Sequence, residues 1–120
     1  MAQILLIDDD ALLRDTVRQL LELDGHQVEE ACDGAVGLSK LRQRTAVDLV
    51  ITDMLMPQMD GYSFVQEIKR HDVLRNIPIL VVTAKDEMQE LFVAEGVSCF
   101  LVKPIKTEVF LEKVRQLTGM

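Results

Sequence analysis

The sequence predicts an α/β fold, namely a single doubly wound parallel sheet of five strands with helices on both faces. Short apolar runs recur five times along the chain, and each is followed by a segment with helical periodicity. No Pro- or Ser-rich linker, repeat or low-complexity tract interrupts this alternation. A regular strand–helix alternation with short connections is typical of a parallel sheet that helices cover on both sides. We therefore expect one domain over residues 1–120.

The apolar runs are the predicted strands. They are residues 3–7, 26–31, 48–52, 79–83 and 99–102. The first, third and fourth runs consist almost entirely of Ile, Leu and Val, as in strands that are buried on both faces. The second run contains Glu29 and Glu30 and is therefore predicted to be an edge strand.

The segments between the strands carry apolar residues at helical spacing. Leu13, Val17, Leu20 and Leu21 share one face of the first predicted helix, and Gly25 follows as its stop. The apolar positions of the later helices are Ala35, Leu38 and Leu41; Phe64, Val65 and Ile68 within 62–71; and Met88, Leu91, Phe92 and Val93 within about 86–95. In the last helix, about 107–117, the residues predicted to face inward are Val109, Phe110, Val114 and Leu117. The fourth helix is brief, and Thr107 is the predicted N-cap of the last.

Composition excludes several classes of protein. Apolar residues make up 48% and charged residues 28%, the balance of a folded soluble protein. The net charge of −7 argues against non-specific binding to DNA, although phosphate binding at one local site is compatible with it. No run approaches the roughly 20 apolar residues of a membrane span, and residues 1–7 lack the basic region of a secretory signal. Cys32 and Cys99 have no metal-ligand spacing and are expected to be reduced thiols in a cytoplasmic protein.

Polar residues follow the predicted strands where ligands bind in such sheets, outside the carboxyl ends. They are Asp8, Asp9, Asp10, Asp53, Thr83, Lys103 and Pro104. Carboxylates about 4 Å apart repel by about 1 kcal/mol in water and about 4 kcal/mol at an intermediate dielectric. Lys103 offsets one negative charge, and a hard divalent ion would offset two more. A few carboxylates with waters is how proteins usually hold Mg²⁺, so this edge is a predicted magnesium site.

Some of these acids also have a purely structural explanation. Asp10 is better explained as a residue at a helix N-terminus, where the helix dipole favours an acid. Asp53 alone is also compatible with the start of a turn. Pro57 prevents early helix formation, and Asp60-Gly61 is good turn chemistry, so a structural role is favoured for both residues of that pair.

Four separated motifs resemble those of receiver domains of two-component response regulators, of the chemotaxis-regulator type. They are the Asp8-Asp9 pair, the Asp-x-x-Met-Pro-x-Met-Asp-Gly segment over 53–61, the Thr83-Ala84 pair and the Lys103-Pro104 pair. The resemblance covers essentially the whole chain, in order and in spacing. It implies a flavodoxin-like (βα)5 fold.

The resemblance also implies roles for the site residues. Asp53 would be the nucleophile that accepts a phosphoryl group and becomes an acyl phosphate. Asp9, Asp53 and the backbone carbonyl of Leu55 would ligate Mg²⁺, and Asp8 would act mostly through water. Lys103 would pair with Asp53 and then with a phosphoryl oxygen.

Two further residues are implied to switch the surface after phosphorylation. Thr83 would hydrogen-bond to the phosphoryl oxygen, and Phe100 would move inward behind it. Pro104 would follow a cis peptide bond. Phe100 stands where the family often has Tyr, so no phenol is available there, and a purely structural role as a buried strand aromatic stays open. The spacing from Thr83 to Lys103 is also shorter than usual, so the fourth helix is expected to be short or displaced.

By the same resemblance the protein is a signalling phospho-switch and not an enzyme with a separate substrate. Its implied partners are a sensor histidine kinase or phosphotransfer protein, and a downstream protein or output domain. No direct contact with nucleic acid or membrane is expected, and the domain would be a monomer or a phosphorylation-dependent dimer. Leu12, Arg14, Asp15 and Arg18, with the loop after Lys103, form the implied docking face. No DNA-binding element follows residue 117, and both a stand-alone regulator and a receiver from a longer protein stay open.

Two other classes of protein share part of this pattern. A phosphohydrolase with an Asp nucleophile usually places it after the first strand with a second Asp two positions on, and Asp8 and Asp10 have that spacing. However, 120 residues leave no room for a cap domain, and residues 57–61 would have no role. A flavin carrier would need a Gly- and hydroxyl-rich phosphate loop, which the first strand lacks.

Overall fold

The structure is a computed structural model that describes residues 2–43, 46–53, 61–83 and 89–119. All of the predicted strands are present. They are β1 (Gln3–Ile7), β2 (Gln27–Ala31), β3 (Leu49–Thr52), β4 (Ile79–Thr83) and β5 (Cys99–Val102). The helices are α1 (Ala11–Leu23), α2 (Gly34–Gln43), α3 (Gly61–Arg70), the short 3-10 helix η1 (Leu74–Asn76), α4 (Gln89–Ala94) and α5 (Thr107–Thr118).

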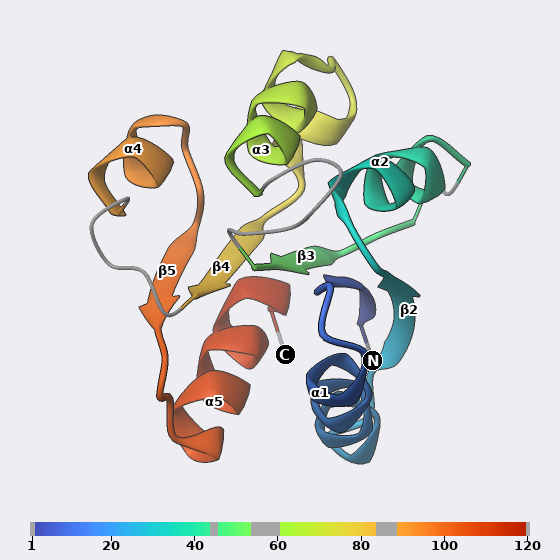
Figure 1. Ribbon diagram of the computed structural model, residues 1–120, viewed down its shortest axis with the longest axis vertical. Coiled ribbons are helices and arrows are strands. Elements are labelled where there is room, and N and C mark those ends of the chain that lie inside the picture. The colour runs from blue at the N-terminus through green and yellow to red at the C-terminus, as the bar shows by residue number, and fades with distance from the viewer. Residues whose placement is uncertain (1, 44–45, 54–60, 84–88, 120) are drawn as a thin grey trace.

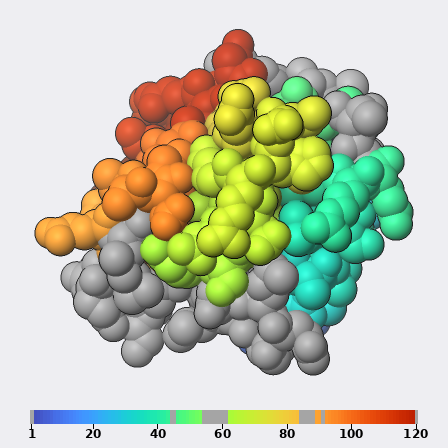
Figure 2. All heavy atoms as spheres, turned by 90° about the horizontal axis from the view of Figure 1, so that it is seen from above, coloured from blue at the N-terminus to red at the C-terminus, as the bar shows by residue number. Residues whose placement is uncertain are grey.

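The five strands form one parallel sheet in the order β2-β1-β3-β4-β5. The predicted doubly wound α/β fold is therefore confirmed, and β2 lies at an edge as its polar sequence predicts. In Figure 1, helices α1 and α5 lie on one side of the sheet and α2, α3 and α4 on the other. Figure 2 shows the three-helix side from above, with α3 between α2 and α4.

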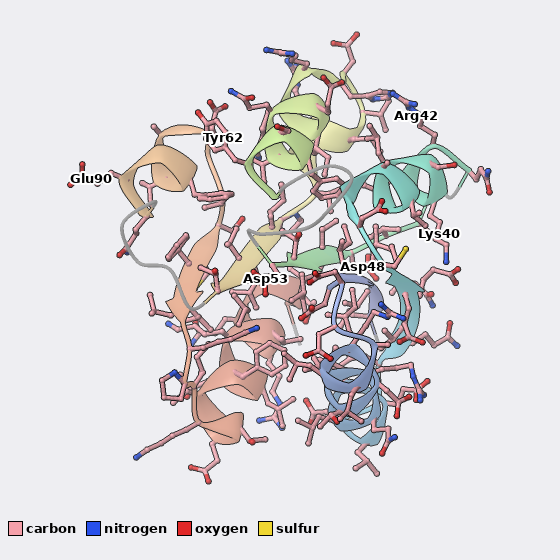
Figure 3. All side chains as sticks on the ribbon, in the orientation of Figure 1. Lys40, Arg42, Asp48, Asp53, Tyr62 and Glu90 are labelled. Atoms are coloured by element: carbon pink, nitrogen blue, oxygen red, sulfur yellow. The ribbon has the colours of Figure 1, made fainter. Side chains whose placement is uncertain are left out.

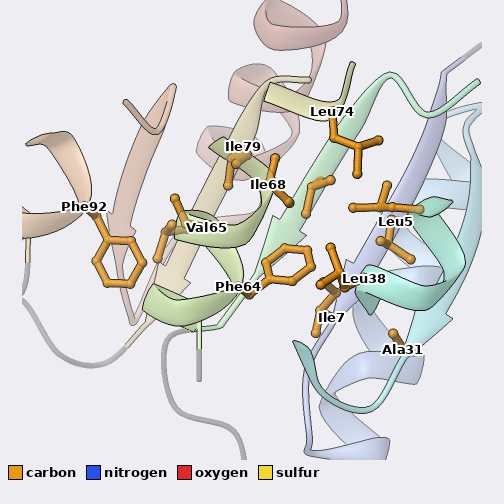
Figure 4. Close-up of a cluster of buried hydrophobic side chains, with 13 residues drawn as sticks. Leu5, Ile7, Ala31, Leu38, Phe64, Val65, Ile68, Leu74, Ile79 and Phe92 are labelled. Carbon is orange, nitrogen blue, oxygen red and sulfur yellow. The ribbon is translucent and has the colours of Figure 1, made fainter. Parts of the chain in front are cut away.

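The sheet separates two apolar clusters. On the side of α2–α4, strand residues such as Leu5 and Ile7 pack with Phe64 and its neighbours (Figure 4). On the other side, Ile4 and Leu6 pack with residues of α1 and α5. Successive residues of a strand point to opposite faces, so a strand that is buried on both sides must be apolar at every position. This explains the continuous apolar sequence of β1, β3 and β4.

Helix α1 ends where the sequence predicts. Asp24 is the C-cap residue, and Gly25 follows with φ +92°, in the left-handed region that favours glycine. Asp24 also accepts two hydrogen bonds from Arg115 of α5, at 3.0 Å from Nε and 2.6 Å from Nη2. The last turn of α1 is thus bound to the last turn of α5.

Helix α2 turns a different stripe to the core than the sequence suggests. Leu38 and Leu41 are buried as predicted, but Ala35 is exposed. Gly37 is buried instead, and a Cβ atom there would lie 2.5 Å from Cδ1 of Ile7. The missing side chain lets the helix approach β1 closely, which fixes the helix face that a hydrophobic stripe alone does not.

Helix α5 differs from its prediction at its start. Phe110 and Val114 are buried, being four residues apart on one face, but Val109 is 41% exposed and was wrongly placed inward. Lys106 and not Thr107 occupies the N-cap, and it makes no side-chain capping hydrogen bond. Helix α4 is short, as predicted; Phe92 is buried in it, whereas Val93 is 57% exposed.

Candidate functional site

The acids after β1 and β3 are neighbours at the carboxyl edge of the sheet. Ile7 pairs with Thr52, so the next residue of each strand, Asp8 and Asp53, begins adjacent connections. The backbone N–H of Asp53 donates to the carbonyl of Ile7 at 3.1 Å, which extends the ladder by one residue. Figure 3 labels Asp53 at this end of β3.

The ammonium from β5 reaches the same place. Lys103 donates its backbone N–H to the carbonyl of Thr83 at 2.7 Å, which joins the ends of β4 and β5. Its Nζ lies 3.1 Å from Oδ2 of Asp53. A cavity of about 50 Å³ is lined by Asp8, Asp53 and Lys103 among other residues. The predicted convergence of acids and an ammonium is therefore present, with the buried Thr83 at the adjoining strand end.

The surroundings of Asp8 shift the pKa of its carboxyl group. Burial raises its pKa above the ordinary value of 3.8, and the nearby charges of Asp53 and Asp9 raise the pKa further. The hydrogen bond from the N–H of Asp10 to Oδ1, 2.9 Å long, lowers the pKa, as does the charge of Lys103. Since the raising causes prevail, the folded protein holds a negative charge here at a cost.

We expect the Asp8→Asn variant to be more stable than the parent at pH 7 without metal. The folded state binds the Asp8 proton more tightly than the unfolded state, so the free energy of unfolding falls as pH rises from 3.8 through the raised pKa. Above that pKa the loss is complete. Asn removes the repulsion between neighbouring carboxylates, worth about 1 kcal/mol, and still accepts from the Asp10 N–H. Urea unfolding between pH 3 and pH 8 measures the change.

The matched control is Asp10→Asn: Asn caps a helix as well as Asp does, but the favourable charge at the helix N-terminus is lost, so this variant should be no more stable than the parent. A lower free energy of unfolding for Asp8→Asn in metal-free buffer at pH 7 would contradict the expectation.

Asp9 and Asp10 differ in their contacts and therefore in their roles. Asp9 is exposed at the edge, and its charge acts on Asp8. Asp10 is the N-cap of α1, and its Oδ1 accepts from the N–H groups of Leu12 and Leu13 at 3.1 Å each. The structural explanation of Asp10 is confirmed.

The edge has the donors that suit a hard divalent ion. The described ranges contain no group of three or more His, Cys, Asp or Glu side chains that would hold a metal ion by themselves. Mg²⁺ commonly needs fewer, because one or two carboxylates suffice when waters and phosphate oxygens complete its shell. Asp8 and Asp53 on one cavity, with Asp9 beside them and an unfavourable charge on Asp8, fit such an ion. The predicted carbonyl ligand of Leu55 lies outside the described residues.

The remaining predicted features are placed as follows. The Lys103–Pro104 peptide bond is cis, as the resemblance implies. Phe100 is half-buried against the cluster on the α3 and α4 side, with its ring centroid 5.6 Å from that of Phe92. This contact is the one that a strand aromatic would make, while the switching role of Phe100 stays a prediction. Pro57 and Asp60 lie outside the described residues.

One residue of the site escaped sequence reasoning. Arg14 was assigned to an exposed docking face, but its side chain is only 18% exposed and its Nη1 donates to the backbone carbonyl of Asp8 at 2.7 Å. Arg18, assigned likewise, is 27% exposed and ion-paired, whereas Leu12 is indeed exposed. An Arg one turn into the helix after an acidic run, with Glu30 at the end of a neighbouring strand, was the available signal.

Comparison with known proteins points to the same class of small α/β domain. The family model of the response regulator receiver domain matches residues 4–115. The DNA-binding dual master transcriptional regulator RpaA of Synechocystis is 34% identical over 119 residues, which cover 98% of this chain and 49% of that protein. The chain thus spans about half the length of this curated relative.

Solved structures agree over the full length. Chemotaxis protein CheY4 of Vibrio cholerae is 32% identical with a TM-score of 0.89, and 98% of each chain is covered. The receiver domain of the sensor histidine kinase PA1611 of Pseudomonas aeruginosa, solved with a magnesium ion coordinated in its active site cleft, is 25% identical with a TM-score of 0.89, over 99% of this chain and 98% of that one.

A parallel sheet that gathers acids and an ammonium at its carboxyl edge defines the class as a doubly wound α/β domain with its site at the strand ends. The chain belongs to the response regulator receiver domain family of two-component systems. Within the described residues, no helix is long and apolar enough to cross a membrane.

Proposed function

We propose that this receiver domain accepts one phosphoryl group on Asp53, with the help of Mg²⁺, and signals by changing its surface. The observation that carries the proposal is the 3.1 Å contact between Nζ of Lys103 and Oδ2 of Asp53 on a cavity that Asp8 also lines. A carboxylate that pairs with an ammonium at the carboxyl edge of a parallel sheet is accessible to a phosphoryl donor, since ligands bind at this edge.

The transfer is a simple displacement. A carboxylate oxygen of Asp53 attacks phosphorus, the P–O or P–N bond to the donor breaks, and the donor leaves with that electron pair. An acyl phosphate remains on Asp53, and later attack by water returns the carboxylate and inorganic phosphate. Phosphoryl transfer depends mainly on positioning and charge neutralisation, which the ammonium of Lys103 supplies on one side.

Asp8, Asp9 and Asp53 are the side chains that we propose to hold Mg²⁺. When bound, the ion would neutralise charge on the transferring oxygens. The raised pKa of Asp8 supports this assignment, since a buried carboxylate group with excess negative charge favours a bound cation.

The proposed response to phosphorylation begins at two strand ends. The product adds negative charge and acceptor oxygens beside Thr83 and Lys103, which are joined by a backbone hydrogen bond. Movement of Thr83 toward the phosphoryl group would open space next to Phe100, whose ring contacts Phe92 of α4. The surface of α4 and β5 would then change between two states.

The test is covalent labelling of the intact chain. Incubation with acetyl phosphate and MgCl₂ should add the mass of one phosphoryl group, and the adduct should be lost at alkaline pH as acyl phosphates are. Intact mass spectrometry measures both. Omission of Mg²⁺ with EDTA present should slow labelling at least tenfold. Failure of the parent protein to gain any labile phosphoryl group would reject the proposed function.

A phosphohydrolase is disfavoured by the position of Asp10. Such an enzyme would need this carboxylate beside that of Asp8, but Asp10 is engaged as the cap of α1. We propose that the only chemistry of the domain is its own phosphorylation and dephosphorylation.

The partners follow from the family. The matched proteins include a transcriptional regulator and a histidine kinase receiver, which supports a sensor kinase or phosphotransfer protein upstream and a protein or output domain downstream. We propose that the domain itself contacts neither nucleic acid nor membrane and works in the cytoplasm as a monomer or a phosphorylation-dependent dimer. Leu12, which is 79% exposed beside the site, suits the docking face.

A further inference from the structure

The peptide between Asp8 and Asp9 is held from one side by a guanidinium. Nη1 of Arg14 donates a 2.7 Å hydrogen bond to the carbonyl oxygen of Asp8. In the same turn, the carboxylate of Asp8 accepts a hydrogen bond from the backbone N–H of Asp10 at 2.9 Å. Both contacts involve the turn that leads from β1 into α1, where the acidic pair lies. The orientation of this turn decides where the two carboxylates point.

Arg14 is itself fixed at more than one point. Its Nε donates to Oε1 of Glu30 on β2 at 3.2 Å, and its backbone N–H donates to the carbonyl of Asp10 at 2.9 Å. Glu30 is held in turn by Arg18, whose Nε lies 3.4 Å from Oε2. The guanidinium group is planar with donors in a rigid fork, so a contact at Nε sets the direction in which Nη1 points.

We propose that Arg14 is a positioning residue for the Mg²⁺ site: by binding the Asp8 carbonyl while anchored on Glu30, it keeps the Asp8 and Asp9 carboxylates turned toward Asp53. The inference rests on the proposed function. A rotation of the Asp8–Asp9 peptide plane would swing the exposed Asp9 side chain, because that plane carries the N–H of Asp9 and defines its φ angle. Partners that orient metal ligands from outside typically change metal affinity by 10- to 100-fold when they are removed.

Arg18 provides a matched control on the same helix. It contacts the same Glu30, and among the described residues it also pairs with Asp15 and Glu22 of α1. Arg14→Met and Arg18→Met therefore remove the same charge and one contact to the same carboxylate, but only the first removes the donor to Asp8. A Lys at position 14 keeps the charge, yet its single ammonium does not reproduce the two-point contact.

The experiment is a titration of each full-length variant with MgCl₂ in the absence of any phosphodonor. Isothermal titration calorimetry gives the dissociation constant, and amide chemical shifts of Asp9 and Asp53 report the site directly. We expect Arg14→Met to weaken Mg²⁺ binding about tenfold, Arg14→Lys to weaken it by an intermediate factor, and Arg18→Met to change it less than twofold. Urea unfolding of the two Met variants should give similar losses of stability, so that affinity and stability separate.

The outcomes are distinct. Equal Mg²⁺ affinity in Arg14→Met and the parent, or equal weakening in both Met variants, would overturn the role of Arg14 and leave the phosphoacceptor proposal intact. Absence of Mg²⁺ binding by the parent protein would overturn both. If Arg14→Met does not fold, the Mg²⁺ affinities of Arg14→Lys and Arg18→Lys are compared in the same titration. Equal affinities in these two variants would then overturn the role of Arg14.

Discussion

The Asp53→Asn variant is expected to form no phosphoryl adduct with acetyl phosphate and Mg²⁺, whereas the parent protein is labelled. The amide of Asn has the shape of the carboxylate, so the half-buried position beside Lys103 is preserved. Its nitrogen lone pair is delocalised and its oxygen carries no full charge, so it is no nucleophile toward phosphorus. Intact mass spectrometry of the variant should show only the unmodified chain after prolonged incubation.

Two further variants make this result diagnostic. Asp10→Asn should be labelled at the parent rate, because Asn still caps α1. Asp8→Asn should be labelled at the same position but 10- to 100-fold more slowly, through weaker Mg²⁺ binding. An adduct that persists without Asp53 and disappears with Asp8→Asn would instead place the nucleophile after β1, as in the hydrolase alternative.

The Phe64→Ala variant is expected to lose about 4 kcal/mol of unfolding free energy. Phe64 is fully buried, and Figure 4 shows its ring between α3 and the residues Ile7 and Leu38. Removal of the ring loses apolar burial and leaves a cavity that the surrounding core closes only in part. Urea unfolding, followed by circular dichroism, measures the loss.

A conservative change at the same position and a change at the surface serve as controls for this loss of stability. Phe64→Leu, which keeps most of the volume, should cost about 1.5 kcal/mol. Val93→Ala, at a position 57% exposed, should stay within about 0.5 kcal/mol of the parent. A loss below 2 kcal/mol for Phe64→Ala would mean that the core between the sheet and α3 rearranges around the missing ring.

The strands were predictable because their burial acts on every residue. In β1, Leu5 and Ile7 enter one cluster and Ile4 and Leu6 the other, so the sequence has no polar position to hide the pattern. Strands β1, β4 and β5 have their predicted bounds, and β2 and β3 each begin one residue later. The edge position of β2 was also predictable, since only an edge strand tolerates Glu29 and Glu30.

Helix faces were harder to predict because hydrophobicity does not fix rotation about the helix axis. In α2 a buried glycine, Gly37, decides which side meets β1, and glycine carries no hydrophobic signal. In α5 the exposed Val109 and the buried Phe110 are adjacent, and only the packing against β1 and β3 distinguishes them. Apolar residues at helical spacing predict that a helix has a buried face. They do not predict which residues at the border of that face are covered by neighbouring elements.

The core of the site was predictable and its support was not. Asp8, Asp53 and Lys103 follow directly from the rule that parallel strands end at one edge. Arg14 contacts a backbone carbonyl and a carboxylate on β2. The position of an Arg one turn after an acidic run is a signal for such contacts, but it does not show which atoms the guanidinium reaches. Long polar side chains that reach across elements require the relative placement of helix and strand, which only the three-dimensional structure supplies.

The paired hydrogen bonds between Arg115 and Asp24 have a mechanical consequence. They join the two helices on one side of the sheet at the end remote from Asp53, so we expect α1 and α5 to separate more readily near Asp53 than near Asp24. A partner protein that contacts both helices near Asp53 can therefore move them apart more easily there than near Asp24.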